Sequence, residues 1–422
     1  MKNRRYVNSV IFLCSLVYFI SYITRINYGS VILEIVHSRG ITNTAASAAL
    51  TGSFVTYGVG QLVSGYMGDK IKPVTLIFAG MMISVVMNIL LPFMTNVAIM
   101  TFVWSVNGFA QAFMWPPLVK YLTNLLSTED YNRASMCVSW GSYIGTVAVY
   151  LLAPFCISLL DWRFVFFISA GCGFAMAIIW LVCGKALERH GRGLAAEKKE
   201  SNEKMPLTEK VHFERKLILI LVFTMAAIVL QGILRDGITT WMPSYIADTY
   251  KIKNSVSILT NVVMPVFAIV VSRVILWIYT KKLNNEEVCA GTMFALGSGA
   301  SLLLYVLCDK SAPVSVFLSA IITSCMHGAN MMLISILPGK FKKYGNVSFM
   351  SGLLNSCTYI GAALSGYGMA LMSQHFGWDG TIFSWAVIAA LGAVICFAIS
   401  KPWGMFLKRI KKDNTNKKPE QE

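Results

Sequence analysis

Apolar residues come in blocks of about 20 along the chain, separated by shorter polar segments. A helix of about 20 residues, rising 1.5 Å per residue, crosses the hydrocarbon layer of a bilayer. The blocks predict twelve membrane-spanning helices at residues 7–31, 46–67, 73–94, 97–119, 134–158, 163–184, 217–245, 254–279, 288–307, 312–337, 347–373 and 380–400. The pattern therefore predicts an all-α integral membrane protein.

The spans fall into two groups of six, separated by a charged segment without any long apolar run. Such a segment is expected to be a solvated loop. We predict four regions, which are an N-terminal six-helix bundle at 1–184, a cytoplasmic linker at 185–216, a C-terminal six-helix bundle at 217–400 and a basic cytoplasmic tail at 401–422. Two bundles of parallel topology are expected to hold a substrate site between them.

Composition agrees with a membrane protein, because 56% of the residues are apolar and only 13% are charged. The net charge of +16 raises the question of nucleic-acid binding. However, 28 of the 36 Lys and Arg residues fall in segments on the side of the N-terminus, and only five lie on the opposite side. By the positive-inside rule this predicts a multi-pass protein of the cell membrane with both termini cytoplasmic. The basic excess indicates topology in the lipid bilayer, and we expect no nucleic-acid partner.

Motifs of enzymes are missing from the sequence. There is no phosphate-binding loop of the Gly-x-x-x-x-Gly-Lys-Ser/Thr type and no His-Glu-x-x-His pair. The ten cysteines form no Cys-x-x-Cys pair, which argues against a metal site or a disulfide framework. We therefore expect no catalytic residues, no cofactor and no bound metal.

Two arginines, Arg25 and Arg235, lie at similar places in the first span of each half. An arginine in mid-membrane costs about 2.5 to 3.5 kcal/mol, so each is expected to have a function. A guanidinium offers a planar fork of donors that matches phosphate or carboxylate oxygens. One arginine from each half is expected to bind the same anion. Asp236 directly follows Arg235, but neighbours on a helix point about 100° apart, so a pair between them is not expected.

The stretch GYMGDKIKP, between the second and third spans, resembles the loop motif of the major facilitator superfamily. The resemblance implies that Gly65, Asp69 and Lys70 take part in switching between conformations. Four further stretches, AFMWPPLVKYL, ILRDGITTWMPSYI, YFISYITRINY and FGWDG, are similar to segments of the organophosphate:phosphate antiporters, whose best-known members carry glycerol phosphate and hexose phosphates. This narrower resemblance touches both halves of the chain.

Helical spacing and the resemblance together give the remaining candidates for substrate binding. Tyr18 and Tyr22 share a face with Arg25, and Tyr57 and Gln61 form a similar pair in the second span. Further candidates are Trp115, Ser142, His327 and Tyr359. Trp115 shares a possible cavity face with Asn107 and Gln111, close helix packing explains the polar stripe around Ser142 equally well, and His327 can be an ordinary neutral imidazole.

The sequence departs from the family in two of these places. Phosphate-binding members have a lysine where Gln61 stands and a histidine where Ser142 is aligned, so both departures remove a positive charge. Three functions remain open. The first is a secondary transporter that exchanges a phosphorylated metabolite for inorganic phosphate by alternating access. The second is a proton-coupled symporter of a sugar acid or another carboxylate. The third is a membrane receptor that senses a sugar phosphate. The partners would be a small anion, with phosphate or a proton as the coupling species, and we expect a monomer.

Overall fold

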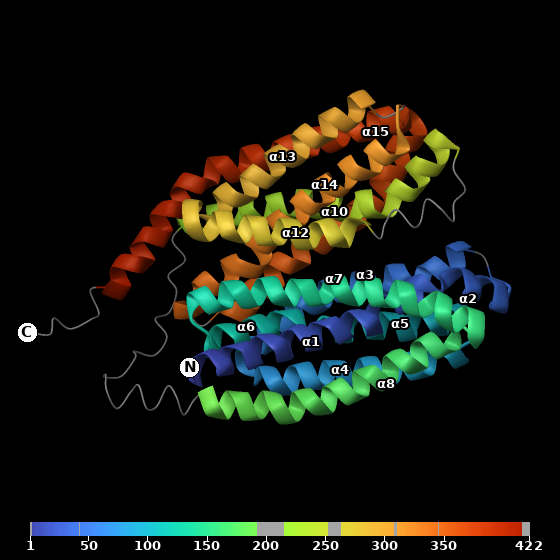
Figure 1. The fold of residues 1–422 in the computed structure, drawn as a ribbon, viewed down its shortest axis with the longest axis horizontal. Coiled ribbons are helices and arrows are strands. Elements are labelled where there is room, and N and C mark those ends of the chain that lie inside the picture. The colour runs from blue at the N-terminus through green and yellow to red at the C-terminus, as the bar shows by residue number, and fades with distance from the viewer. Residues whose placement is uncertain are drawn as a thin grey trace, which may run out of the picture. The chain divides into compact units, whose positions relative to one another are not determined.

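The computed structural model describes residues 2–41, 43–191, 215–251, 263–307, 310–344 and 346–415. Every regular element within these ranges is a helix (Figure 1). The first half contains α1 (Lys2–Ser30), α2 (Ile32–Arg39), α3 (Asn43–Lys70), α4 (Pro73–Leu90), α5 (Val97–Gln111), α6 (Trp115–Leu125), α7 (Thr128–Leu159) and α8 (Arg163–Ile179). The second half contains α10 (Arg215–Tyr250), α12 (Val263–Ile278), α13 (Glu286–Leu307), α14 (Ala312–Asn330) and α15 (Val347–Thr415).

Short helical turns of other types extend or connect these helices. The 3-10 turns are η1 (Leu91–Phe93) and η6 (Leu337–Tyr344). The π turns are η2 (Trp180–Gly184), η4 (Tyr279–Leu283) and η5 (Met331–Ile336). The all-helical fold predicted from the sequence is confirmed for the described residues.

Eleven helices in the described ranges are long and apolar enough to cross a membrane. The predicted span that is not among them is 46–67, which lies in α3. This helix is continuous over 28 residues, but its many Gly, Ser and Thr residues make it less apolar than the others. Small residues let helices approach closely in a membrane. At Gly60, for example, a Cβ atom would lie 2.7 Å from the Cβ of Ala112.

The predicted span 97–119 is divided between two helices. The chain leaves α5 after Gln111 and enters α6 at Trp115. Pro116 and Pro117 stand in the first turn of α6. Proline is tolerated there because the first amides of a helix have no acceptor within the helix. The two prolines thus fix where α6 starts.

The long helix α15 consists of two helices joined at Gly377, which has φ 66° and ψ −174°. Positive φ is strained for residues with a Cβ atom but open to glycine. The sequence FGWDG therefore supplies the bend at which the last helix begins.

The chain forms two compact units. Unit 1 comprises Met1–Glu209 and Ile334–Tyr359, and unit 2 comprises Lys210–Leu333 and Ile360–Glu422. Residues Ile334–Tyr359 therefore pack with helices of the first half, although they fall in the C-terminal bundle expected at 217–400. The predicted domain boundaries stay a prediction.

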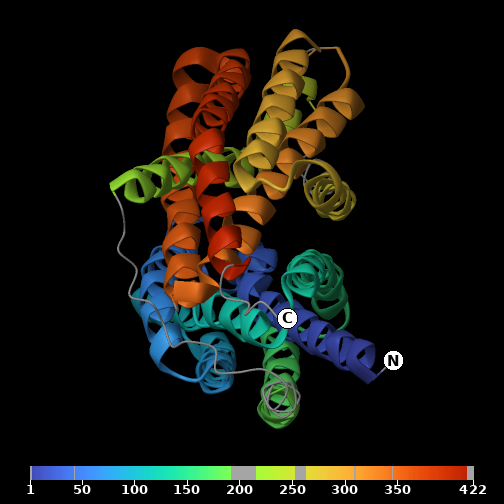
Figure 2. The same ribbon diagram turned by 90° about the vertical axis from the view of Figure 1, so that its left-hand side faces the viewer.

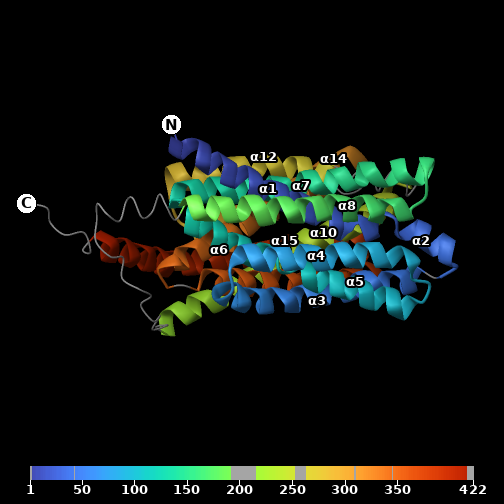
Figure 3. The same cartoon turned by 90° about the horizontal axis from the view of Figure 1, so that it is seen from below.

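Within unit 1, α1 lies beside α7 and α8, and α8 also packs against α4 (Figure 3). Glycines allow the closest of these contacts. A Cβ atom at Gly141 would lie 2.5 Å from the carbonyl oxygen of Ser15, and one at Gly145 would lie 2.7 Å from that of Phe19. These contacts hold the middle of α1 against α7. In unit 2, α10, α12 and α13 all pack against α14 (Figure 2).

Candidate anion-binding site

Arg25 lies in a cluster of tyrosine rings within unit 1. Its guanidinium carbon is 3.8 Å from the ring centre of Tyr57 and 5.5 Å from the ring centres of both Tyr22 and Tyr359. A cation within about 6 Å of an aromatic centre is attracted by the negative face of the ring. The α1, α3 and α15 helices each contribute at least one of these rings. The cluster therefore stabilises a positive charge in an apolar region without neutralising it.

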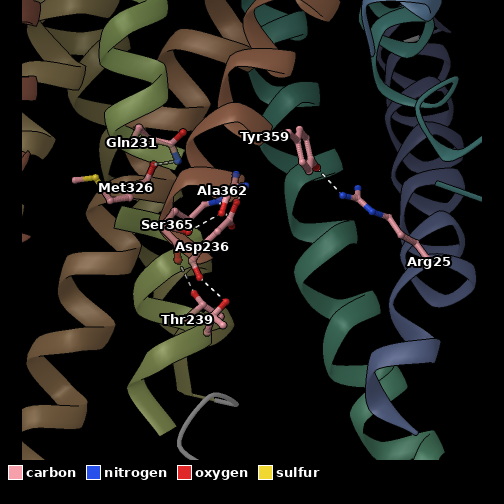
Figure 4. A network of polar contacts seen from close by, with 10 residues as sticks. Arg25, Gln231, Asp236, Thr239, Met326, Tyr359, Ala362 and Ser365 are labelled. Atoms are coloured by element: carbon pink, nitrogen blue, oxygen red, sulfur yellow. Dashed lines mark hydrogen bonds and ion pairs between the residues drawn. The ribbon is translucent and has the colours of Figure 1, made fainter. Parts of the chain in front are cut away.

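Tyr359 makes the one recorded hydrogen bond of Arg25 in the described structure. Arg25 Nη2 donates to Tyr359 Oη at 2.5 Å (Figure 4). The rings of Tyr57 and Tyr359 lie 4.5 Å apart, and Gly58 leaves room for them because a Cβ there would be 3.3 Å from the Cβ of Tyr359. Among the described residues no carboxylate forms an ion pair with Arg25. The charge of Arg25 is therefore met by neutral groups.

Tyr18 extends this cluster along α1. Its ring lies 5.3 Å from that of Tyr22 and 5.1 Å from the indole of Trp115. Trp115 is buried, and its indole Nε1 has no acceptor among the described residues. Sequence spacing predicted that Tyr18, Tyr22 and Arg25 share one face, and the structure adds Trp115 to this region. An indole donor without a protein acceptor is a group that a bound oxygen can satisfy.

Two other candidates in unit 1 have different neighbours. Gln61 is fully buried, and its Nε2 donates to the carbonyl oxygen of Ala112 at 3.4 Å. Ser142 donates its hydroxyl to the carbonyl oxygen of Ser139 at 2.7 Å, on the face of α7 that packs closely on α1. No recorded contact joins either side chain to Arg25. For Ser142, the packing explanation is favoured by these contacts.

A network of buried amide side chains surrounds Thr24, the residue before Arg25. The sequence did not predict this network. Thr24 is its centre, since its carbonyl oxygen accepts from Asn88 Nδ2 at 3.0 Å and from Asn107 Nδ2 at 3.2 Å. Gln111 Nε2 donates to Thr24 Oγ1 at 2.8 Å and to Ser84 Oγ at 2.8 Å. Asn107 and Gln111 therefore hold α1 against α4 and α5, which favours helix packing over a cavity face shared with Trp115. The occurrence of Asn107 and Gln111 in an apolar span was the feature of the sequence that could have indicated this network.

Arg235 in unit 2 has a carboxylate partner. Its Nε donates to Asp236 Oδ1 and its Nη2 to Asp236 Oδ2, each at 2.8 Å. The expectation that neighbours on a helix would not pair is therefore wrong. The two contacts place Nε and Nη2 of the guanidinium against the two carboxylate oxygens of Asp236. The charges of the two arginines thus have different surroundings.

His327 lies on α14, which packs against α10, the helix that carries Arg235. The preceding turn of α10 is tied to α14 by Gln231, whose Nε2 donates to the carbonyl oxygen of Met326 at 3.2 Å (Figure 4). The structure therefore places Arg235 and His327 on neighbouring helices of unit 2. The assignment of these residues to substrate binding stays a prediction.

The loop after α3 meets the start of α15. Asp69 accepts from the backbone amides of Ser348 at 3.1 Å and Phe349 at 2.8 Å. A carboxylate at a helix N-terminus satisfies free amides and interacts favourably with the helix dipole. Gly65 is needed nearby, because a Cβ there would lie 3.0 Å from the carbonyl oxygen of Ser348.

Two lysines near this loop, Lys70 and Lys120, have different contacts. Lys70 contacts Tyr66, with its Nζ 3.9 Å from the ring centre, and has no recorded contact with α15. Lys120 instead donates to the carbonyl oxygens of Gly68 and Asp69, each at 2.8 Å, and lies 3.7 Å from the Asp69 carboxylate. The sequence reasoning did not assign Lys120 to this junction, although it follows the Trp-Pro-Pro stretch.

The sequence profile of the Major Facilitator Superfamily matches residues 14–366. The chain belongs to this superfamily. A probable hexose phosphate transport protein of Chlamydia muridarum is 24% identical over 409 residues, covering 89% of this chain and 87% of that protein. The glycerol-3-phosphate transporter of Bacillus subtilis is 22% identical over 398 residues, covering 90% of this chain and 88% of that protein. Membrane sensor protein UhpC of Salmonella typhimurium is 22% identical over 396 residues, with coverages of 90% and 88%.

A solved structure of this superfamily supports the fold. The proton:xylose symporter XylE matches with a TM-score of 0.72 and 10% identity, covering 94% of this chain and 96% of that chain. At this identity the match shows the fold alone. The resemblance to major facilitator proteins and to organophosphate transporters is thus confirmed, and the chain is a multi-pass membrane transporter of this superfamily.

Proposed function

We propose that this transporter carries a small organic anion across the cell membrane, and that the anion is a phosphorylated metabolite exchanged for inorganic phosphate by alternating access. Relatives with matches over most of the chain are named as hexose phosphate and glycerol-3-phosphate transporters. We further propose that the transporter is a monomer with both termini in the cytoplasm, since most basic residues lie on that side of the predicted spans.

The observation that carries the proposal is the state of Arg25. Burying an isolated charge is costly, and buried cations are normally paired with anions. Arg25 instead has a phenol hydroxyl and aromatic rings as its recorded partners. These groups hold the guanidinium in place and leave its charge uncompensated. A phosphate or carboxylate group would supply the missing negative charge and accept two parallel hydrogen bonds.

The direct test is uptake into proteoliposomes that contain the purified protein. Vesicles are loaded with inorganic phosphate or left without it, and labelled glycerol 3-phosphate, glucose 6-phosphate and gluconate are offered outside. Uptake of a phosphate ester that is faster with internal phosphate than without it would support exchange. Failure to take up any of the three would count against the proposal.

A proton-coupled symporter of a carboxylate is the second candidate, and the pair between Arg235 and Asp236 favours it. This pair lowers the net positive charge at Arg235. In unit 1, Gln61 and Ser142 are likewise neutral. A less positive site is better matched to a monoanion than to a phosphate dianion. Uptake of gluconate that stops with a protonophore and ignores internal phosphate would select this candidate. Binding of a sugar phosphate without any transport would instead support a sensor.

A further inference from the structure

Asp236 occupies the donors that Arg235 would use for an incoming anion. Both of its carboxylate oxygens accept from the guanidinium, one from Nε and one from Nη2, each at 2.8 Å. This two-pronged arrangement is the one in which arginine binds carboxylates and phosphates in general. Asp236 therefore mimics a bound anion at the side of the guanidinium.

The position of the pair makes it stronger than an ordinary surface ion pair. The Arg235 side chain is 15% exposed and the Asp236 side chain is 31% exposed. Exposed ion pairs contribute little because water and salt screen them, whereas partly buried pairs are screened less. The backbone here is regular helix, with Thr239 Oγ1 donating to the carbonyl oxygen of Arg235 at 2.7 Å. The pair is thus held on a rigid element, while Asp236 keeps enough exposure to move away.

We propose that Asp236 is an internal counter-ion, which neutralises Arg235 in the empty carrier and is displaced when the transported anion binds. This inference rests on the proposed function, because it requires that Arg235 bind the transported anion. Arg25 provides the contrast, since its recorded partners are neutral. An anion that reaches Arg25 meets no built-in competitor there, whereas at Arg235 it must replace a carboxylate.

The first consequence concerns affinity. An anion can bind at Arg235 only if the two charge-assisted hydrogen bonds to Asp236 break. The observed affinity is therefore lower than the guanidinium alone would give. Removing the carboxylate while keeping the size of the side chain should raise affinity. Charge-assisted hydrogen bonds are stronger than neutral ones by an amount that corresponds to about tenfold in affinity. The Asp236→Asn variant should therefore bind the anion about tenfold more tightly.

The second consequence concerns the empty carrier. A cation without a counter-ion is costly to enclose, so a carrier with such a cation reorients readily only when an anion is bound. At Arg235 the counter-ion is already present in the protein. Asp236 therefore removes this cost at Arg235, whereas Arg25 keeps an uncompensated charge. The pair thus lowers the barrier to return of the empty carrier enough for slow net uptake. Exchange is then faster than net uptake without being obligatory.

Uptake by proteoliposomes tests both consequences, with labelled inorganic phosphate and labelled gluconate as the probes. Wild-type protein is compared with Asp236→Asn, with Asp236→Glu, which keeps the carboxylate, and with Asp248→Asn. Asp248 is an exposed aspartate on the same helix that accepts from Trp378 at 3.2 Å, so its variant is matched in charge. Each vesicle preparation is assayed with and without unlabelled probe inside.

We expect Asp236→Asn to lower the half-saturating probe concentration about tenfold and to make uptake dependent on internal anion. Asp236→Glu and Asp248→Asn should resemble wild type in both respects. Wild-type uptake accompanied by an unchanged or higher half-saturating concentration in Asp236→Asn would overturn the internal counter-ion and leave the proposed function standing. No uptake of either probe by wild type would overturn both.

The wild-type protein gives a second measurement if Asp236→Asn does not fold. Net uptake into vesicles without internal anion is expected, because the empty carrier can return. Wild-type uptake that occurs only in exchange for an internal anion would overturn the internal counter-ion without any variant.

Discussion

At the residue scale, Arg25 and Arg235 differ in what surrounds them. Arg25 is held by a hydroxyl and three rings, and Arg235 is held by a carboxylate. Rings attract a guanidinium through its charge, while a carboxylate cancels that charge. Arg25 is therefore the stronger candidate for a residue that receives an anion directly.

Arg25→Lys tests the need for the guanidinium fork. Lysine keeps the charge but loses the planar pair of donors, so affinity for the anion should fall at least about tenfold. Half-saturation of uptake in proteoliposomes measures this. Arg273→Lys is the matched control, because Arg273 is an exposed arginine in another apolar helix, α12. Equal affinities of Arg25→Lys and wild type would show that only the charge matters.

Sequence spacing placed part of this residue cluster and missed the rest for a physical reason. Tyr18 and Tyr22 could be assigned to the face of Arg25, because residues three and four apart on one helix are neighbours. The pair between Arg235 and Asp236 could not be predicted in this way, because a long arginine side chain has several rotatable bonds and its reach is not fixed by the direction of its Cβ atom. The partners of Thr24 come from other helices, so only the folded chain identifies them.

At the scale of elements, glycines and buried amides determine how α1 is held. Gly141 and Gly145 bring α7 against it on one side, and Asn88, Asn107 and Gln111 bond to it on the other. Without a hydrophobic driving force between helices in lipid, close packing and interhelical hydrogen bonds supply much of the association energy. The hydropathy pattern predicted the apolar helices well. It also predicted a span at 46–67 in α3, although this helix is less apolar than the others because its close packing uses small residues.

Gly141→Ala tests the contact between α1 and α7. The added Cβ would lie 2.5 Å from the carbonyl oxygen of Ser15, so the helices must separate. Overpacking of this kind costs about 1 to 3 kcal/mol, and we expect a lower midpoint of thermal unfolding in detergent. Gly171→Ala is the control, since nothing lies within 4 Å of its added Cβ. Equal loss of stability in both variants would contradict the role of close packing.

Asp69→Asn tests the junction between the loop after α3 and the start of α15. The amide side chain keeps one acceptor oxygen but loses the charge that interacts with the helix dipole. We expect a loss of about 0.3 to 1 kcal/mol, seen as a lower unfolding midpoint. Glu129→Gln, which removes an exposed acid from the first turn of α7, should have a smaller effect. A larger effect of Glu129→Gln would argue against the importance of the junction.

At the scale of the whole molecule, the chain is a helical transporter of the major facilitator superfamily built from two compact units. The sequence predicted the fold class because apolar blocks of helical length have few other uses. The sequence did not reveal that residues Ile334–Tyr359 pack with unit 1. That grouping arises from contacts such as those of Asp69 with Ser348 and of Arg25 with Tyr359, which join residues far apart along the chain.

Topology can be tested with reporters fused after Glu422. The partition of 28 basic residues on one side against five on the other predicts a cytoplasmic C-terminus. A fluorescent reporter that folds only in the cytoplasm should therefore be active, and a reporter that is active only outside should be silent. The opposite result would contradict an even number of spans together with a cytoplasmic N-terminus.

The central claim is that this transporter moves a small anion bound by Arg25, and one measurement tests it most directly. Purified wild-type protein and Arg25→Ala are reconstituted in vesicles loaded with inorganic phosphate, and uptake of labelled glycerol 3-phosphate, glucose 6-phosphate and gluconate is normalised to the amount of protein. We expect wild type to take up at least one of these anions and Arg25→Ala to lose at least about nine-tenths of that uptake, because each 1.4 kcal/mol of lost binding is about tenfold in affinity. Near-native uptake by Arg25→Ala would contradict the claim.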